Sequence, residues 1–380
     1  MSMKTNTYLA LAAVGCVILG ACAKGGENAT LKTLHVNVDA IEQSVRTSVF
    51  VSEAKAVALE TNDDCLIDEI ACIRLKGDML YISDGASFFK FDLNGNFVSK
   101  IQKRGDGPEE YSYAGMFDVD ANGDIVLTND NKLLRYDWSG RKLSESPMAS
   151  QAFDIRFCKD GTLIAYSGNM GSTDQKVFET NGNSLSNGYL LNKDSIMAKY
   201  MFVFGIDPLF TPNADGLYLS EFFNDTIYTI KDNSVSHNVV YDYGGRNIPL
   251  SFLHMSHENI MTFFQDLQKT NYIRNLGVYM ESSSFYINSF MADDLYYSLI
   301  SKDGEINLVT KQMHDDILFH GYKIAPIRVV DAATFVSVVE PAMLSEYAQS
   351  LSPEERDEVK RFIKNSDEEP NPIIYIASMK

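Results

Sequence analysis

Short strand-like runs, each broken by a tight turn, recur along this sequence and constrain its fold more than any other feature. Residues 71–75 and 79–83 are two β-rich runs that flank a Gly-containing turn, so they predict a hairpin. Residues 88–92 and 97–101 continue the pattern, with the turn Asn94-Gly95 between them. Four antiparallel strands within about 35 residues are typical of one blade of a β-propeller.

The same order of runs and turns recurs in four later parts of the chain. A turn that ends in glycine follows the third run at 92–95, 137–140, 179–182 and 301–304. The first three of these turns lie roughly 40–45 residues apart, which is the period of four-stranded blades. Five blades are therefore visible in the sequence.

A sixth blade is assembled from residues 322–330, 334–339 and 373–376. A strand near the mature N-terminus, such as 57–59, completes it, because joining both chain ends in one sheet ties down open sheet edges. We therefore predict an all-β fold, a six-bladed β-propeller of four-stranded antiparallel blades, with residues 31–380 as one domain.

Two stretches depart from the strand pattern and predict short helical insertions, near 256–269 and 342–364. Ile260, Phe264 and Leu267 stand at i, i+4 and i+7, so the first stretch presents one apolar face. In the second, Ser352 at the N-cap and Glu355 at N3 form a capping box. Such insertions gather on one face of a propeller, where they shape its binding surface.

The N-terminus has the features of an export signal. Residues 8–21 form an apolar run that no charge interrupts, which is too short for a hydrocarbon core that needs about 20 residues. The boundary Leu19-Gly20-Ala21-Cys22 resembles the lipobox of bacterial lipoproteins, in which the cysteine is lipidated and becomes the first mature residue. We expect a signal peptide over 1–21, lipid attachment at Cys22 and a flexible tether over 22–30; the alternative is a plain secretory signal.

Charge and cysteine content limit the partners of the mature chain. The formal net charge is −18 for the whole chain and −19 after removal of residues 1–21, which contain Lys4. This charge excludes attraction to nucleic acid and to anionic lipid headgroups. Membrane contact therefore depends on the lipid at Cys22. The residue after Cys22 is not Asp, and the sorting rules of the lipoproteins that this segment resembles then imply the outer membrane. Either the periplasmic or the surface side of that membrane fits the sequence. Cys65 and Cys72 are the nearest cysteine pair, and either a disulfide or two buried thiols fits them.

Three motifs resemble those of the six-bladed β-propeller lipoproteins of unknown function, a family related in architecture to NHL-type propellers. They are Asp64-Cys65-Leu66-Ile67, then Arg104-Gly105-Asp106-Gly107-Pro108-Glu109-Glu110-Tyr111, and finally Glu369-Pro370-Asn371-Pro372. The resemblance covers nearly the whole mature chain. Glu109 stands where the family commonly has glycine, and Pro370 stands where it has Asp.

The loop from Arg104 to Tyr111 is the candidate binding segment. Arg104 and Glu110 offer charges of opposite sign to a ligand, next to Tyr111. Asp106, Glu109 and Glu110 also fit a calcium site, whereas the alternative is a blade-to-blade turn in which Tyr111 packs inward. The histidine clusters are His254 with His257, which have no third metal ligand nearby, and His314 with Asp315, Asp316 and His320; the alternative for both is polar surface histidines.

These observations predict a membrane-anchored, non-enzymatic propeller that binds a protein or a small molecule. Phosphate-binding glycine motifs and a Gly-x-Ser-x-Gly nucleophile turn are absent from the sequence, so no cofactor and no catalytic residue is assigned. One alternative is a calcium-dependent hydrolase or lactonase-like propeller; another is a scaffold subunit of an envelope complex. The propeller axis discriminates between them, because an enzyme brings several carboxylates together there.

Overall fold

The computed structural model describes residues 31–198, 209–326, 328–363 and 370–380. The predicted signal peptide (1–21), tether (22–30) and lipid site Cys22 lie outside the described residues. Among the described helices, none has both the length and the apolar character needed to cross a bilayer.

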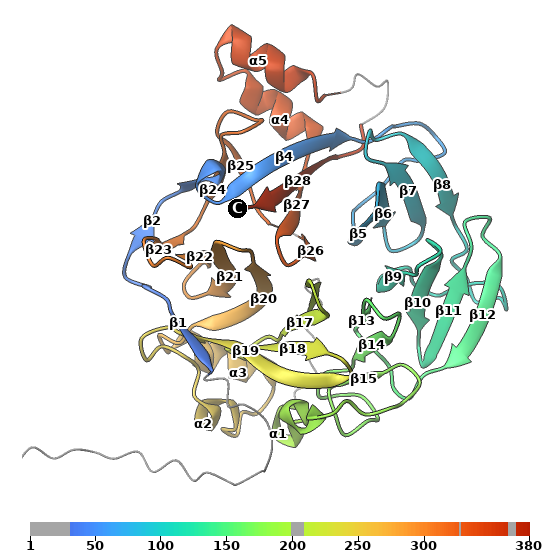
Figure 1. Ribbon diagram of the computed structural model, residues 1–380, viewed down its shortest axis with the longest axis vertical. Coiled ribbons are helices and arrows are strands. Elements are labelled where there is room, and N and C mark those ends of the chain that lie inside the picture. Colours follow the sequence, from blue (N-terminus) through green and yellow to red (C-terminus); the bar gives the residue numbers. More distant parts are fainter. Residues whose placement is uncertain (1–30, 199–208, 327, 364–369) are drawn as a thin grey trace, which may run out of the picture. The chain divides into compact units, whose positions relative to one another are not determined.

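The described strands form seven small sheets, or blades, of three to five strands, arranged around a central axis (Figure 1). The first three sheets contain β5 (Cys72–Lys76), β6 (Met79–Ser83), β7 (Phe88–Asp92) and β8 (Phe97–Ile101); β9 (Phe117–Val119), β10 (Ile125–Asn129), β11 (Lys132–Tyr136) and β12 (Lys142–Pro147); and β13 (Asp154–Phe157), β14 (Leu163–Tyr166) and β15 (Val177–Glu179). The next two contain β16 (Phe210–Pro212), β17 (Leu217–Ser220), β18 (Thr226–Lys231) and β19 (Ser234–Asp242), and then β20 (Arg274–Glu281), β21 (Phe285–Met291), β22 (Leu295–Ser301) and β23 (Asn307–Thr310). The last two contain β24 (Met313–Asp315) and β25 (Tyr322–Ile324), and then β26 (Arg328–Asp331), β27 (Thr334–Val339) and β28 (Ile373–Met379).

The repeated glycine turns have one common geometry. Gly95, Gly140, Gly182 and Gly304 all have positive φ, between 80° and 95°, a backbone conformation that glycine adopts without steric cost. Each of these glycines donates its N–H to the carbonyl oxygen three residues earlier. The turns at 92–95, 137–140 and 301–304 connect antiparallel strands of the same blade, whereas the turn at 179–182 follows β15, the last strand of its three-stranded sheet.

The predicted count of six blades is wrong, because the structure has seven. Residues 322–330 were expected to be one strand, but they contribute to two sheets: β25 pairs with β24, and β26 pairs with β27. Pro326 lies between β25 and β26 and has no N–H to continue a strand ladder. The chain therefore changes sheet at this point, and β24, β25 and a short N-terminal strand make a separate three-stranded sheet.

Strands from both chain ends close the molecule, as predicted. The closing strand β28 lies between β27 and the N-terminal strand β4 (Val51–Ala58), antiparallel to both. Because β28 lies in the middle of a four-stranded sheet, its backbone N–H and C=O groups are paired on both sides. The sequence placed the N-terminal partner at residues 57–59, whereas β4 starts earlier and is eight residues long.

The segment 32–46, which we call the N-terminal strap, extends three sheets in succession (Figure 1). Its strands β1 (Lys32–His35), β2 (Ile41–Glu42) and β3 (Val45–Arg46) pair in parallel with β19, β23 and β24. Each strap strand stands at the end of its sheet. The strap therefore covers three edges that would otherwise expose unpaired backbone groups.

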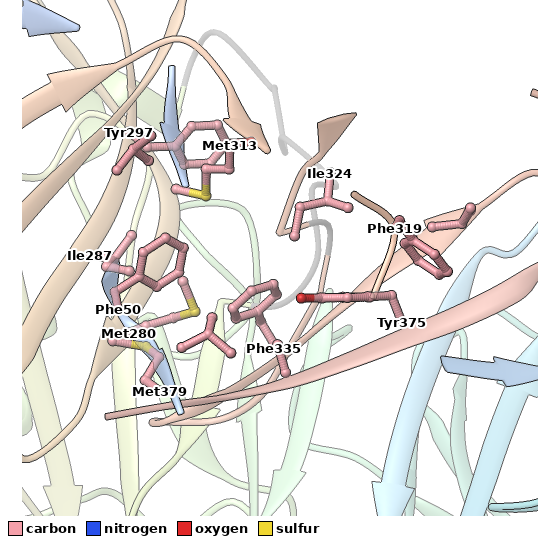
Figure 2. Close-up of a cluster of buried hydrophobic side chains, with 14 of the residues drawn as sticks. Phe50, Met280, Ile287, Tyr297, Met313, Phe319, Ile324, Phe335, Tyr375 and Met379 are labelled. Carbon is pink, nitrogen blue, oxygen red and sulfur yellow. The ribbon is translucent and has the colours of Figure 1, made fainter. Parts of the chain in front are cut away.

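A large apolar cluster joins the three-stranded sheet to its neighbours (Figure 2). Phe50, Met313, Phe335 and Tyr375 are all completely buried. Phe50 lies just after the 3-10 helix η1 (Thr47–Val49), and its ring centroid is 6.3 Å from that of Phe335 on β27. Burying such large side chains contributes about 1.5–3 kcal/mol each, so this cluster stabilises the closure.

The predicted helical insertions are present. The first region contains α3 (Ile260–Gln268), and the second contains α4 (Pro341–Ala348) and α5 (Pro353–Lys360). Three short helices of the described chain were not predicted, namely α1 (Ser195–Ala198), α2 (Leu250–Leu253) and the 3-10 helix η2 (Gly188–Leu191). The predicted capping box of Ser352 and Glu355 is confirmed at the start of α5. In α3, Phe263 and Leu267 are buried, which places one apolar face against the propeller.

No disulfide joins Cys65, Cys72 or Cys158 in the described part of the chain. Cys65 and Cys72 are both completely buried, but they belong to different apolar clusters. Of the two alternatives left by the sequence, the structure therefore has two buried thiols and no disulfide between them.

Candidate functional site

The innermost strands of the propeller enclose the candidate site. β5, β9, β13, β16, β20 and β26 lie next to one another around the axis (Figure 1). A cavity of about 910 Å³ opens between the first three of these strands and extends outward between the β9–β12 and β13–β15 sheets. Its size is that of a small-molecule site, for which about 300–1,000 Å³ is typical.

Four charged side chains of the innermost strands form a buried network at the axial end of this cavity. Arg74, Asp118, Asp154 and Arg156 are between 2% and 8% exposed. Nη1 of Arg156 donates to Asp118 Oδ1 at 3.1 Å, and Nη2 of Arg74 lies 3.5 Å from Asp154 Oδ1. We call these four residues the axial network. Each arginine faces a carboxylate, so its charge is compensated within the protein.

Backbone N–H groups donate further hydrogen bonds to the carboxylates of Asp118 and Asp154. Asp118 Oδ2 accepts from the N–H of Phe157 at 2.7 Å, and Asp154 Oδ2 accepts from the N–H of Phe210 at 3.2 Å. The two aspartates thereby connect β9, β13 and β16, the innermost strands of three neighbouring sheets. The axis does bring carboxylates together, but arginines and backbone amides occupy their oxygens.

Arg156 retains one unused donor. Its Nε is buried and has no hydrogen-bond acceptor among the described residues, although Nη1 of the same guanidinium is bonded. Burial first, and then the positive charge of Arg74, lower the pKa of Arg156 from its ordinary value. A buried N–H without an acceptor costs about 1–3 kcal/mol, so this part of the network is less well satisfied than the two aspartates.

The mouth of the cavity is charged as well. Arg135 forms ion pairs with Asp120 and with Asp124, the latter at 3.0 Å. The ammonium group of Lys76 donates to the carbonyl oxygens of Val119 and Asp120 at 2.7 and 2.9 Å. These contacts hold polar groups at the turn that follows β9, where the cavity meets solvent.

The walls between the charged ends are mostly apolar. Val126 and Leu163 are buried members of a small cluster, and Phe157 packs against it; all three line the cavity. The β13–β15 sheet has three strands where its neighbour has four.

The predicted loop residues Arg104, Glu110 and Tyr111 lie at the other end of β9 from the cavity mouth, because they precede this strand and the cavity turn follows it. Nε of Arg104 donates to the Ser112 carbonyl at 3.2 Å, and Glu110 Oε2 accepts from the Gly107 N–H at 2.8 Å. A Cβ on Gly105 would lie 2.0 Å from Glu110 Oε2, so a side chain there would displace the Glu110 carboxylate from its hydrogen bond with Gly107.

Tyr111 belongs to the core. It is completely buried, and its hydroxyl donates to the Ala86 carbonyl at 3.0 Å. Desolvation raises the pKa of Tyr111 to about 12. The three predicted residues thus lie together in one loop whose polar groups satisfy each other; binding by Arg104 and Glu110 stays a prediction.

Metal ligands do not converge among the residues that the structure describes: no group of three or more His, Cys, Asp or Glu side chains could hold a metal ion there. The predicted histidine groups are separate. His254 contacts Asp194 at 2.6 Å, His257 contacts Asp266 at 3.0 Å, and His320 contacts Glu358 at 2.8 Å. Asp106, Glu109 and Glu110 form no such group either.

The sequence model of the family described as "Domain of unknown function (DUF4934)" matches residues 31–378. The chain belongs to this family. A search of curated proteins gives no match to this DUF4934 chain.

Among solved structures, this DUF4934 chain is similar to a protein described as a "Putative exported protein" from Bacteroides fragilis NCTC 9343. The identity is 20% and the TM-score 0.65, over 92% of this chain and 100% of that chain. It is also compared with a member of the DUF4221 family from Bacteroides vulgatus, at 11% identity and a TM-score of 0.44, over 87% and 97% of the two chains. The first similarity shows a shared fold.

The cavity residues of this DUF4934 chain were missed by the sequence analysis. Arg74, Asp118 and Arg156 each stand in the middle of a short apolar strand. Charged residues inside otherwise buried strands are costly unless they are paired, and the three recur at corresponding places in successive repeats. This recurrence could have indicated a buried charged site from the sequence. Which of these residues pair with each other depends on how the sheets are arranged in space, and the sequence does not show that.

Proposed function

We propose that this protein is an exported, lipid-anchored propeller that binds a small molecule in the cavity at its axis and does not catalyse a reaction. The single observation that carries the proposal is the cavity of about 910 Å³ with apolar walls and polar groups at both ends. A few fixed polar groups in an apolar cavity are typical of ligand sites.

The arrangement of the axial carboxylates supports binding over hydrolysis. A general acid or base needs a proton-accepting oxygen or nitrogen that faces the substrate. Asp118 and Asp154 instead direct their oxygens to Arg156, Arg74 and backbone amides. The network supports a fixed recognition surface.

The anchor is proposed on the residues before the propeller. Leu19-Gly20-Ala21-Cys22 supports lipid attachment at Cys22, and several acyl chains give stable anchoring. The similarity to an exported protein supports an envelope location, and the absence of Asp after Cys22 supports the outer membrane. Arg104 and Glu110 belong to the same proposal as a second surface that a protein partner could contact.

Cavity binding can be tested with the neutral fluorescent probe N-phenyl-1-naphthylamine, which brightens in apolar sites. We expect saturable binding of one probe per chain. Ala121 is exposed and lines the cavity, so Ala121→Trp should occupy the mouth without disturbing the core and weaken binding at least about tenfold.

The matched control is Ala342→Trp, since Ala342 is an exposed alanine on α4 that does not line the cavity. It should bind the probe like the wild type. Binding that does not saturate, or that both tryptophan variants weaken equally, would overturn the proposal.

A further inference from the structure

We infer that the helices α1, α2 and α3 contact the lipid bilayer through exposed apolar side chains, so that the cavity mouth faces away from the membrane. The inference rests on the proposed function, because the lipid on Cys22 is what holds the propeller at the bilayer. Three observations carry it: the side of the propeller on which these helices lie, their exposed apolar side chains, and their distance from the tether.

The innermost strands of neighbouring sheets end on the side of the propeller where the cavity opens. The carbonyl of Pro212, at the end of β16, accepts from the N–H of Ala332, and the Ala332 carbonyl accepts from the N–H of Glu281 at the end of β20. Pro212 and Asp331 also line the cavity. The segments that lead from one sheet to the innermost strand of the next therefore lie on the opposite side, which we call the connection face.

The three helices lie next to one another on the connection face (Figure 1). α2 and α3 belong to the segment between β19 and β20, and they share a small apolar cluster that contains Phe252 and Phe263. α1 is joined to them, because Nε2 of His254, at the end of α2, contacts Oδ2 of Asp194, directly before α1, at 2.6 Å.

Apolar side chains of these helices and of the residues beside them remain exposed outside that cluster. Leu250, Met255 and Met261 are 62%, 49% and 66% exposed, and Ile196 is 36% exposed. We call these four residues the apolar patch. In the described part of the chain, the turns that follow the innermost strands on the cavity side carry no exposed large apolar side chain. Exposed apolar patches mark contact with a membrane or with another protein.

The segments that carry the apolar patch are neutral, although the chain as a whole is acidic. Residues 185–198 contain one basic and one acidic side chain, and residues 243–273 contain two of each, whereas the whole chain has a formal net charge of −18. Contact with lipid therefore meets no net charge repulsion within these segments. Their charged residues are Lys193 and Asp194 in the first, and Arg246, Glu258, Asp266 and Lys269 in the second.

The tether reaches the propeller close to the apolar patch. β1 begins at Lys32, which pairs with Val239 of β19. β19 ends three residues later, at Asp242, about 10 Å further along the strand, and the segment with α2 and α3 follows. Residues 22–30 extend at most about 30 Å. A lipid on Cys22 therefore keeps the bilayer within reach of the patch at high effective concentration, which favours lipid over a protein partner.

The test measures contact with acyl chains by tryptophan quenching in the full-length, lipidated protein anchored in vesicles. The vesicles consist of phosphatidylcholine with or without bromine on its acyl chains, because bromine quenches a tryptophan that it contacts. Met261→Trp places a tryptophan in the apolar patch, and Ala121→Trp places one at the cavity mouth. We expect brominated lipid to lower the fluorescence of the added tryptophan at least about twofold in Met261→Trp and to leave Ala121→Trp unchanged.

The natural Trp138 supplies a constant background. It is the single tryptophan of the chain, and its Nε1 donates to the Gly123 carbonyl at 2.7 Å, in the turn after β9 on the cavity side. The wild-type protein should therefore show the same fluorescence in both kinds of vesicle.

Leu250→Ser with Met255→Ser, added to Met261→Trp, should remove at least about half of the quenching, since less apolar surface then enters the lipid. The matched control is Val98→Ser with Leu143→Ser in the same background, because both residues are exposed and apolar on the outer strands β8 and β12. This control should leave the quenching unchanged. Equal melting temperatures of the variants show that the fold is retained.

The outcomes separate this inference from the proposed function. Absence of quenching in Met261→Trp, in a protein that still floats with the vesicles, would overturn the membrane contact, leave the anchor in place and assign the patch to a protein partner. Equal quenching in Met261→Trp and Ala121→Trp would overturn the orientation of the cavity mouth. Failure of the wild type to float with the vesicles would overturn both the anchor and this inference.

Discussion

Asp315 on β24 connects three parts of the chain through one carboxylate. It is completely buried, and it accepts hydrogen bonds from the Tyr375 hydroxyl at 2.7 Å, Thr47 Oγ1 at 3.2 Å and the Phe319 N–H at 2.6 Å. Desolvation, and then the charge of Asp315, raise the pKa of Tyr375. These contacts join the closing strand β28 to the N-terminal segment.

We expect Asp315→Asn to lower the free energy of unfolding by about 3 kcal/mol, because an amide cannot accept all these bonds and leaves buried donors unsatisfied. Chemical denaturation measures the change. The neighbouring Asp316 is exposed and accepts from the Ser48 N–H and hydroxyl, so Asp316→Asn should cost about 1 kcal/mol or less. Similar losses in the two variants would contradict this role of Asp315.

Asp225 makes stability depend on pH. Its burial raises the pKa of the carboxyl to about 6, and the charge of Asp242 adds to this, whereas the hydrogen bond from Asn247 at 2.7 Å opposes it. Because the pKa of Asp225 is higher in the folded state than in the unfolded state, the protonated carboxyl contributes to stability. This contribution is fully present below the unfolded pKa of about 3.9 and is lost as pH rises to about 6. Ionised Asp225 therefore destabilises the protein at neutral pH.

Asp225→Asn should raise the free energy of unfolding by about 1 kcal/mol at pH 7.5, after allowance for partial solvent exposure. The gain should disappear near pH 4, where the aspartate is protonated in the folded state. Melting temperatures of the wild type and the variant from pH 4 to 8 measure the effect. A gain that is independent of pH would show that the charge is not its cause.

The closing strand β28 supplies the middle of its sheet. Removing 373–380 should expose the edges of β27 and β4 together with the apolar cluster that contains Tyr375, and we expect a loss of soluble folded protein. Truncation after Met379, which removes Lys380 alone, is the control and should stay folded. The amounts of soluble protein and far-ultraviolet circular dichroism measure the outcome; a soluble, folded protein without 373–380 would contradict the closure.

Strands with turns between them were predictable, whereas the parallel pairing of the strap strands was not. The hairpin of β5 and β6 and the repeated glycine turns depend on local sequence, and local sequence predicted them. The strap strands β1, β2 and β3 are two to four residues long, too short to show an alternating pattern. Their parallel partners lie far along the chain, so no turn links them and nothing local indicates the pairing.

The candidate site was less predictable than the fold for the same reason. The loop Arg104 to Tyr111 attracted attention because its charges and glycines are adjacent in sequence. The cavity instead combines single residues from separate repeats, such as Arg74, Asp118 and Arg156, which meet only after the sheets are arranged around the axis. The charge of each residue was visible, but its partner was not.

Lipid anchoring at Cys22 can be tested by detergent partition. We expect the wild type to enter the detergent phase of Triton X-114 and Cys22→Ser to remain as unprocessed precursor or as a product in the aqueous phase, because only a cysteine can accept the lipid. Cys158→Ser is the matched control: burial raises the pKa of Cys158 to about 12, which leaves it a protonated thiol. Unchanged partition and mobility of Cys22→Ser would contradict the anchor.

The N-terminal strap and the residues directly after it, up to Ser52, determine when the molecule can finish folding. His35 bonds to a residue 207 positions later, Thr47 to one 268 positions later and Ser52 to one 326 positions later. Ribosomes add about 5–20 residues per second, so the first residues of the propeller wait roughly 15–65 s for their last partners. Until then the chain holds unpaired strand edges, and long-range pairing of this kind is intrinsically slow. The protein therefore depends on being kept unaggregated until its final strand has been made.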